Sequence, residues 1–322
     1  DELSRTGTDA EVVPFPGPLL AFGRSAAPVR NALGAPAALA GTVILLIRFV
    51  RLTRRARIDL IHSNGIKAHI LGCLLTAVTR IPLVWHVRDI LPPGPLRWLL
   101  RRLGRRVPSA IIANSAAVAE PFSRVRADGS RVRIVHNGID LESYAPGPGS
   151  AVLRREYGLD PERPTVGMVG VLVPWKGFDV FVDAAARLAH RAPRAVFFIV
   201  GDEIYDTRGH RGYRRHLEEK VRGLGLEGRV FFTGFRRDVP AIMNSLDVVV
   251  HASVRPEPFG RVILEAMACG RPVIATDAGG APEVLGRDGS AGILVPPGDA
   301  RAMAEAVLEL LRAPARRARM GQ

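Results

Sequence analysis

Two glutamates stand eight positions apart in the stretch RPEPFGRVILEAMACGRPVIATDAGG, which runs from Arg255 to Gly280. Glu265 lies in a segment that is otherwise apolar, and burying its carboxylate is costly unless hydrogen-bond donors reach it. A ligand with two neighbouring hydroxyl groups, such as a sugar, can supply those donors. Glu257 belongs to the preceding PEPFG turn. It is either a solvated loop residue or a second contact to the same ligand.

The PEPFG turn also offers backbone donors. A helix is expected directly after it, so the N–H groups of Phe259, Gly260 and Arg261 have no acceptor within that helix. Such groups point at whatever lies beyond the helix start, and they favour polar or anionic ligands there. We therefore expect this turn to contribute to a binding site.

Lys176 is the second candidate for chemistry. It lies in the segment VLVPWKG, between a predicted strand and a helix predicted over Phe178–His190. A lysine at that point sits beside the positive end of a helix, where the two together can neutralise a diphosphate without a metal ion. The alternative interpretation is a lysine on an exposed turn.

Histidines give weaker signals. His86 closes the predicted strand Pro82–Val87 and is followed by an arginine and an aspartate. A lone histidine at a strand end is as often structural as functional. His62 and His69 have no third ligand at the spacing of a metal site, so we expect no metal.

The helices and strands that position these residues can be predicted from the pattern of apolar residues along the chain. Short apolar runs alternate with longer helical patterns, which is typical of βα units and parallel sheets. Strands are predicted at Glu11–Pro14, Asp59–Ser63, Pro82–Val87, Ala110–Asn114, Val132–Val135, Thr165–Leu172, Ala195–Gly201, Arg229–Thr233, Asp247–Ala252, Pro272–Ala275 and Ile293–Val295. The sequence therefore predicts an α/β protein with two doubly wound, Rossmann-like parallel-sheet domains.

A segment rich in proline and glycine, Tyr144–Pro164, is the expected linker between them. We place the domains at residues 1–144 and 145–322 and expect ligands between them, outside the carboxyl ends of the strands. The first domain opens without the strand and glycine turn of a doubly wound sheet, and the last predicted helix, Asp299–Ala313, runs into a basic tail. We therefore expect a fragment of a longer protein.

Composition narrows the class of protein. The formal net charge is +14, and residues 1–150 hold 20 Lys and Arg against 10 Asp and Glu. A basic first domain fits nucleic acid, an anionic membrane or phosphate-bearing substrates. The apolar run Leu33–Ile47 is shorter than a membrane span needs, so a core helix is expected. Cys73 and Cys269 are expected to be buried thiols in a reducing compartment.

The stretch PEPFGRVILEAMACGRPVIATDAGGAPEVL resembles the E-x7-E donor-site signature of the GT-B glycosyltransferases of family 4. Further blocks resemble that family in the same order along the chain. They are DLIHSN, VWHVRD, IANS, VHNGID, VLVPWKG and TGFRRD. The family begins with a strand and glycine-rich loop and ends with a helix that crosses back onto the first domain, so the resemblance also leads us to expect that this sequence is truncated at both ends.

This resemblance implies a role for each matching residue. At the donor sugar it places His86, Glu257 and the backbone of Phe259 and Gly260. At the donor diphosphate it places Lys176, and at the ribose and base of the nucleotide it places Glu265, Gly234 and Phe235. The family's usual arginine after the strand glycine is Val171 here. Either Arg261 or Arg255 substitutes for it, or the leaving group is stabilised less strongly.

The resemblance also implies an activity. We expect a retaining transferase that moves a hexosyl unit from a UDP- or GDP-sugar to a glycan, lipid-linked or small-molecule acceptor, as in bacterial polysaccharide biosynthesis. No metal or other cofactor is expected. The expected location is the cytoplasm, with peripheral contact at the inner face of the plasma membrane. The alternatives are another GT-B enzyme, such as a nucleotide-sugar epimerase, and a basic nucleic-acid-binding protein. Low aromatic content and the lack of a recognisable binding module argue against nucleic acid.

Overall fold

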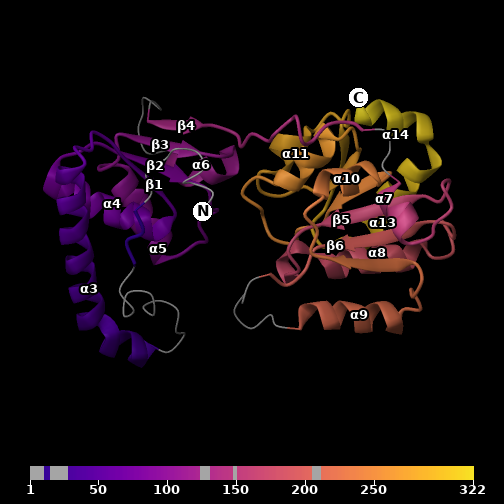
Figure 1. The fold of residues 1–322 in the computed structure, drawn as a ribbon, viewed down its shortest axis with the longest axis horizontal. Coiled ribbons are helices and arrows are strands. Elements are labelled where there is room, and N and C mark those ends of the chain that lie inside the picture. Colours follow the sequence, from indigo (N-terminus) through magenta and orange to yellow (C-terminus); the bar gives the residue numbers. More distant parts are fainter. Residues whose placement is uncertain (1–10, 15–27, 124–130, 148–150, 205–211) are drawn as a thin grey trace. The chain divides into compact units, whose positions relative to one another are not determined.

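The computed structural model describes residues 11–14, 28–123, 131–147, 151–204 and 212–322. The chain divides into two compact units and contains two β-sheets (Figure 1). One sheet has four strands in the order β1-β2-β3-β4, and the other has six in the order β10-β9-β8-β5-β6-β7. The predicted α/β architecture with two parallel-sheet domains is confirmed.

The four-stranded sheet alternates with helices along the chain. Its elements are α3 (Pro28–Arg55), β1 (Ile61–Asn64), α4 (Ile66–Thr79), β2 (Leu83–Val87), α5 (Pro95–Gly104), β3 (Ala110–Ala113), α6 (Ala116–Ser123) and β4 (Val132–Ile134). β1 pairs with β2 in parallel. Leu83 and Trp85 of β2 are both 0% exposed, so every second residue of that strand fills the core.

Two predictions for this part of the chain need correction. Glu11–Pro14 is not a strand, and Val12 is 88% exposed. An isolated extended segment gains stability only by pairing. The helix predicted over Leu33–Ile47 extends over the longer α3, and it is only partly a core helix, since Leu45 is 1% exposed but Val43 is 49% exposed. An apolar composition does not reveal how many faces of a helix are covered.

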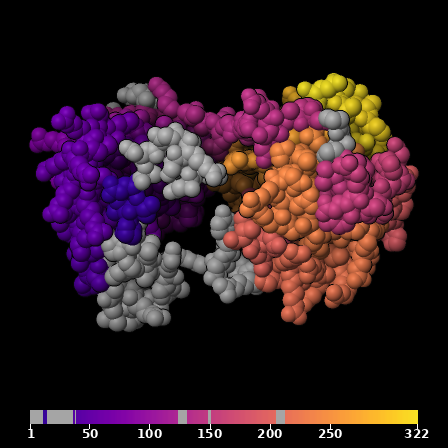
Figure 2. Space-filling model, viewed as in Figure 1, coloured from indigo at the N-terminus to yellow at the C-terminus, as the bar shows by residue number. Residues whose placement is uncertain are grey.

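The six-stranded sheet carries the rest of the chain. Its strands are β5 (Thr165–Val169), β6 (Val196–Val200), β7 (Val230–Gly234), β8 (Val248–His251), β9 (Val273–Thr276) and β10 (Gly292–Val295). Its helices are α7 (Val152–Glu156), η1 (Pro174–Lys176, a 3-10 turn), α8 (Phe178–Leu188), α9 (Tyr213–Gly223), α10 (Val239–Asn244), α11 (Arg261–Ala268), α12 (Ala281–Leu285), α13 (Ala300–Arg312) and α14 (Pro314–Gly321). The basic tail thus forms a helix, α14, which lies at the surface (yellow in Figure 2).

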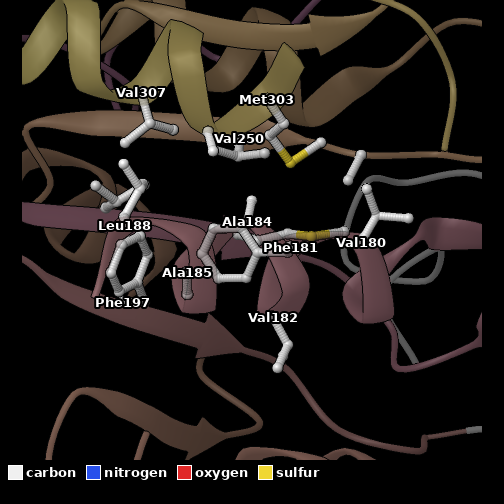
Figure 3. Packing of buried hydrophobic residues seen from close by; sticks show 14 of the residues in the cluster. Val180, Phe181, Val182, Ala184, Ala185, Leu188, Phe197, Val250, Met303 and Val307 are labelled. Carbon is white, nitrogen blue, oxygen red and sulfur yellow. The ribbon is translucent and has the colours of Figure 1, made fainter. Parts of the chain in front are cut away.

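Helices cover both faces of this sheet. In Figure 1, α8 and α9 lie on one side of it and α10 and α11 on the other. Successive residues of β6 therefore enter different cores: Phe197 and Ile199 pack with α8 and α13, and Phe198 packs on the opposite side. Figure 3 shows the first core, where Met303 and Val307 of α13 face α8. Burial on both faces explains the continuous apolar runs of these strands.

Both cysteines are free and buried, as predicted. Among the described helices, none combines the length and the apolar character required to cross a bilayer.

Candidate active site

Three loops meet at one edge of the six-stranded sheet. They follow β5, β8 and β9, which are neighbours in the sheet, so their carboxyl ends lie side by side. The backbone N–H of Val254 donates to the carbonyl oxygen of Trp175 at 2.9 Å, and that of Gly280 donates to the carbonyl oxygen of Glu257 at 2.8 Å. These bonds fix the loops against one another.

Two glycines permit this close approach. Gly177 has φ 82°, and a Cβ on it would lie 2.0 Å from the carbonyl oxygen of Ala252. Gly279 has φ 64°, and its Cβ would lie 2.2 Å from the carbonyl oxygen of Glu257. Both the left-handed backbone and the contact distance exclude a side chain, so only glycine is compatible with this packing.

Glu257 lies at the centre of the three loops. Its Oε1 accepts a hydrogen bond from Lys176 Nζ, in a close ion pair. Its Oε2 lies 2.5 Å from His251 Nε2 and accepts a bond from Ser253 Oγ at 2.8 Å. The Glu257 side chain is only 20% exposed. The structure thus brings together two predicted site residues, Lys176 and Glu257, and adds His251 and Ser253.

The charge of Glu257 follows from these contacts. Burial by itself would raise the pKa of its carboxyl group, but the hydrogen bond and charge of His251, followed by those of Lys176, outweigh burial and hold the pKa far below its usual range. Glu257 is therefore ionised. His251 is itself only 5% exposed, and its Nδ1 has no hydrogen-bond partner among the described residues.

His251 and Ser253 were not identified from the sequence. Along an extended segment, alternate residues point the same way, so the run His251, Ser253 places two polar side chains on one side just before the PEPFG turn. That period of two was a usable signal.

Glu265 is in a different electrostatic state. It lies on α11 and is 7% exposed, which confirms a buried carboxylate in an apolar helix. Its described partner is Arg261, whose Nη2 donates to Oε1 at 3.2 Å and whose side chain is 60% exposed. Burial raises the pKa of Glu265 and the nearby Arg261 opposes that shift only in part.

Phe259 and Gly260 lie between the two glutamates. Phe259 is 4% exposed, so its ring belongs to the core rather than to a ligand surface. Gly260 immediately precedes α11, and the first N–H groups of that helix have no acceptor within it. The predicted roles of both residues concern the backbone and stay predictions.

A small pocket of about 150 Å³ opens at the carboxyl ends of β5, β6 and β7. Phe235 and Val171 are among its lining residues, and Gly234 is the last residue of β7. Arg236 also lines it, but its guanidinium is held by Glu156 and by Asp238 at 2.7 to 2.8 Å. The pocket therefore presents mainly apolar side chains and backbone to a ligand.

His86 belongs to β2 in the four-stranded sheet. Its ring stacks on that of His62 with centroids 5.5 Å apart. Close by, burial and then the charges of His86 and His62 lower the pKa of His69 to about 4. Within the described ranges, no group of three or more His, Cys, Asp or Glu residues is placed to hold a metal ion.

Residues 150–322 match the family model described as glycosyl transferases group 1, and residues 1–143 match the model described as glycosyltransferase family 4. LpsB of Rhizobium meliloti strain 1021, a lipopolysaccharide core biosynthesis mannosyltransferase, is 33% identical over 69% of this chain and 67% of its own length. The alpha-D-kanosaminyltransferase of Streptomyces kanamyceticus is 34% identical over 70% of this chain. The match covers only 57% of that enzyme.

Solved structures agree with these matches. HepE of Anabaena, determined in complex with UDP and glucose, is 35% identical with a TM-score of 0.77, over 86% of this chain and 74% of HepE. A glycosyltransferase of Rickettsia africae ESF-5 has a TM-score of 0.79 over 99% of this chain and 79% of its own, at 19% identity. At that identity the likeness concerns the fold alone.

Proposed function

Since this chain belongs to the group 1 glycosyltransferases and has the GT-B fold that its sequence blocks predicted, we propose that it transfers a hexosyl unit from a nucleotide diphosphate sugar to an acceptor, with retention of the anomeric configuration. The observation that carries the donor side of the proposal is the cluster at the loops after β5, β8 and β9, where Lys176 contacts Glu257.

Lys176 is the residue proposed to hold the donor diphosphate. It lies in η1, directly before Gly177 and α8, so its ammonium group adds to the positive end of that helix. Its side chain is 24% exposed, which leaves it within reach of a ligand at the surface of the cluster. An ammonium group has three donors, so it can bind a phosphate oxygen and still contact Glu257.

Both glutamates then have distinct partners. Glu257 accepts hydrogen bonds from hydroxyl groups of the transferred sugar while His251 and Ser253 hold it in place. Glu265 accepts from the two ribose hydroxyls, which supply the donors that its buried carboxylate lacks. The pocket at Phe235 receives the base. We favour UDP over GDP because HepE, at 35% identity, was determined with UDP-glucose.

In the reaction, the bond between the anomeric carbon and the β-phosphate oxygen breaks, and an acceptor oxygen bonds to that carbon from the same face. The departing diphosphate takes up the acceptor hydroxyl proton. Negative charge grows on the diphosphate as the bond lengthens, so fixed positive charge there lowers the barrier. Lys176 and the start of α8 supply it, and no protein nucleophile or metal ion is required by this scheme.

Arg261 is the proposed substitute for the arginine that Val171 replaces. Its side chain is 60% exposed and donates to Glu265 Oε1 at 3.2 Å, so it can turn towards a bound diphosphate. Arg261→Ala is expected to lower turnover strongly while the melting temperature of the free protein stays close to the wild-type value. Unchanged kinetics would remove Arg261 from the donor site.

The acceptor and the location of the protein stay proposals. We assign the acceptor, a glycan, a lipid-linked sugar or a small molecule, to the unit that contains His86. The excess of positive charge in residues 1–150 supports peripheral contact with an anionic membrane. The two free, buried cysteines support a reducing compartment such as the cytoplasm.

The test is a screen of UDP- and GDP-sugars with acceptors, in which product stereochemistry is read by NMR. We expect transfer with retention from a UDP-sugar, and a loss of about 100-fold or more in turnover for Lys176→Ala. Arg215→Ala, which removes a positive charge from an 83% exposed side chain, is the control and should be neutral. Conversion of the donor to its epimer without an acceptor would identify an epimerase instead.

A further inference from the structure

Helix α5 exposes a group of large apolar side chains. Trp98 is 62% exposed, Leu96 is 41% exposed and Leu99 is 38% exposed, all within the first turn and a half of the helix. Leu100, which follows Leu96 by one turn and lies nearly opposite Trp98 around the helix, is 1% exposed. The exposed residues therefore belong to an ordered helix that is held to its own unit through Leu100.

Arginines continue the same surface. Arg102 is exposed and its guanidinium lies over the Trp98 ring, 5.5 Å from the centroid. Arg105 and Arg106, also exposed, follow at the end of the helix, one turn further along the stripe that contains Trp98 and Arg102. We call Leu96, Trp98, Leu99, Arg102, Arg105 and Arg106 the α5 patch.

The sequence around the patch is strongly basic. Between Asp89 and Glu120 the chain has five arginines and no aspartate or glutamate. The patch thus combines an apolar first turn with a cationic end formed by Arg102, Arg105 and Arg106. A partner that covered only the apolar residues would leave the arginines without anionic groups. A partner that bound only the arginines would leave Trp98 exposed to water.

We propose that the α5 patch binds the surface of an anionic lipid bilayer. Tryptophan prefers the boundary between headgroups and acyl chains, where its apolar ring is buried and its N–H stays hydrated. Leucines beside it add apolar area at the same depth, and arginines contact lipid phosphates. The helix lies in the plane of the interface and does not cross it, in keeping with its length of 10 residues.

Nucleic acid and an acidic protein are the other candidate partners for a basic patch. Binding of single strands relies on several aromatic rings that stack on successive bases, whereas Trp98 is the one aromatic residue of this helix. The arginine already over its ring further limits stacking. A bilayer accommodates leucine, tryptophan and arginine at once.

This inference rests on the peripheral location in the proposed function, and it is independent of the donor chemistry. A membrane-bound α5 would keep the unit that contains His86 at the bilayer surface, and this suits an acceptor carried on a lipid. The test therefore measures binding without any donor.

Flotation with vesicles of phosphatidylcholine and phosphatidylglycerol, against pure phosphatidylcholine, tests the proposal. We expect binding to the anionic vesicles that weakens with salt. Replacement of Arg102, Arg105 and Arg106 by glutamine should lower the affinity for anionic vesicles on the order of 100-fold, because each arginine near the membrane surface contributes a factor of about five. Trp98→Ser should weaken it about tenfold, and salt should change that factor little.

The matched control replaces Arg155, Arg215 and Arg222 by glutamine, which lowers the net charge by the same amount at exposed positions outside α5. It should bind nearly as the wild type. Trp98→Phe should keep binding but abolish the blue shift of tryptophan fluorescence on vesicles, because Trp85 is fully buried and the half-buried Trp175 lies in η1, outside the α5 patch. UDP-dependent stabilisation, unchanged in all variants, would show that the donor site is intact.

Three results would overturn the proposal. They are wild-type binding by the triple variant in α5, an equal loss in the control variant, and tighter binding of a charge-matched oligonucleotide than of the vesicles. The first two would assign binding to another surface or to overall charge, and the third would identify a nucleic-acid site.

Discussion

Glu265→Gln is expected to stabilise the free protein. The carboxylate is 7% exposed, and its described partner, Arg261, is an exposed side chain that water can solvate without help. Replacing a buried charge that is poorly compensated is neutral to favourable, and we take the gain as about 1 kcal/mol. For a unit of this size that corresponds to a rise of about 2 to 4 °C in melting temperature.

The gain should depend on pH with a definite sign. Because burial raises the pKa of Glu265, the native state holds that proton more readily than the unfolded state does. The associated stability is present below the ordinary value of 4.5 and is lost as pH rises through the folded pKa. The advantage of the glutamine variant is therefore largest near neutral pH and disappears in acid.

With UDP bound, the wild type should become more stable than the Glu265→Gln variant. Hydrogen bonds to a charged acceptor contribute about 2 kcal/mol, so losing the ribose contacts raises Kd about 30-fold. UDP at about 100 times the wild-type Kd stabilises the wild type by about 2.7 kcal/mol but the variant by only about 0.9 kcal/mol. The variant, which is more stable than the wild type by about 1 kcal/mol without UDP, is then less stable by about 0.8 kcal/mol.

Thermal unfolding with and without UDP measures both effects. The control is Glu219→Gln, which removes a carboxylate from another i,i+4 ion pair, that of Arg215 and Glu219 at 2.9 Å, whose side chains are 83% and 57% exposed. Exposed ion pairs of this kind contribute little to stability, so the control should leave the melting temperature unchanged both with and without UDP. A Glu265→Gln protein less stable than wild type without UDP would refute the burial argument. An equal UDP shift in both proteins would refute the ribose contact.

Three further predictions concern the packed loops. Glu257→Gln should lower the free energy of unfolding by about 2 kcal/mol at neutral pH, since it removes the carboxylate between its lysine and histidine partners. Because the pKa of Glu257 is lowered, the difference in unfolding free energy between wild type and variant should shrink as pH falls below 4.5. Gly177→Ala should cost about 3 kcal/mol or more through its clash with Ala252, whereas Gly158→Ala, at φ 60° with open space, should cost about 1 kcal/mol; equal melting temperatures would contradict this. His251→Ala should lower kcat about tenfold or more with partial rescue by glutamine, and an unchanged kcat would remove His251 as a positioning residue.

Much of the fold could be predicted because it depends on local patterns. The six-stranded sheet has apolar strands of five residues or so, such as Val196–Val200, and each strand enters two cores, so composition alone marks it. Glycine and proline mark the loops. The same reasoning failed for Glu11–Pro14, where β-propensity was read without a pairing partner, and for α3, whose exposed apolar face looks like any core helix in sequence.

The sequence suggested Lys176 and Glu257 as candidate residues but did not predict their contact. The resemblance implied that they bind different parts of the donor, which stays a prediction, and the structure places them in an ion pair with each other. That pairing depends on loops 81 positions apart in the chain, which no spacing rule connects. It also depends on Gly177 and Gly279, whose role is evident only when the opposing carbonyl groups are located.

The two glutamates of the signature are prepared for a ligand in opposite ways. Glu257 has three donors within the protein. If Lys176 shares its ammonium group with a diphosphate, His251 and Ser253 still hold the carboxylate, and no buried charge is left unpaired. Glu265 has one donor among the described residues, Arg261 at 3.2 Å, and the hydroxyl groups of a ligand would offset the cost of burying its charge. We therefore expect Glu257 to keep its position through donor binding and departure, and Glu265 to contribute free energy to donor binding itself. On this reasoning the first glutamate should control turnover and the second affinity, although both belong to one motif.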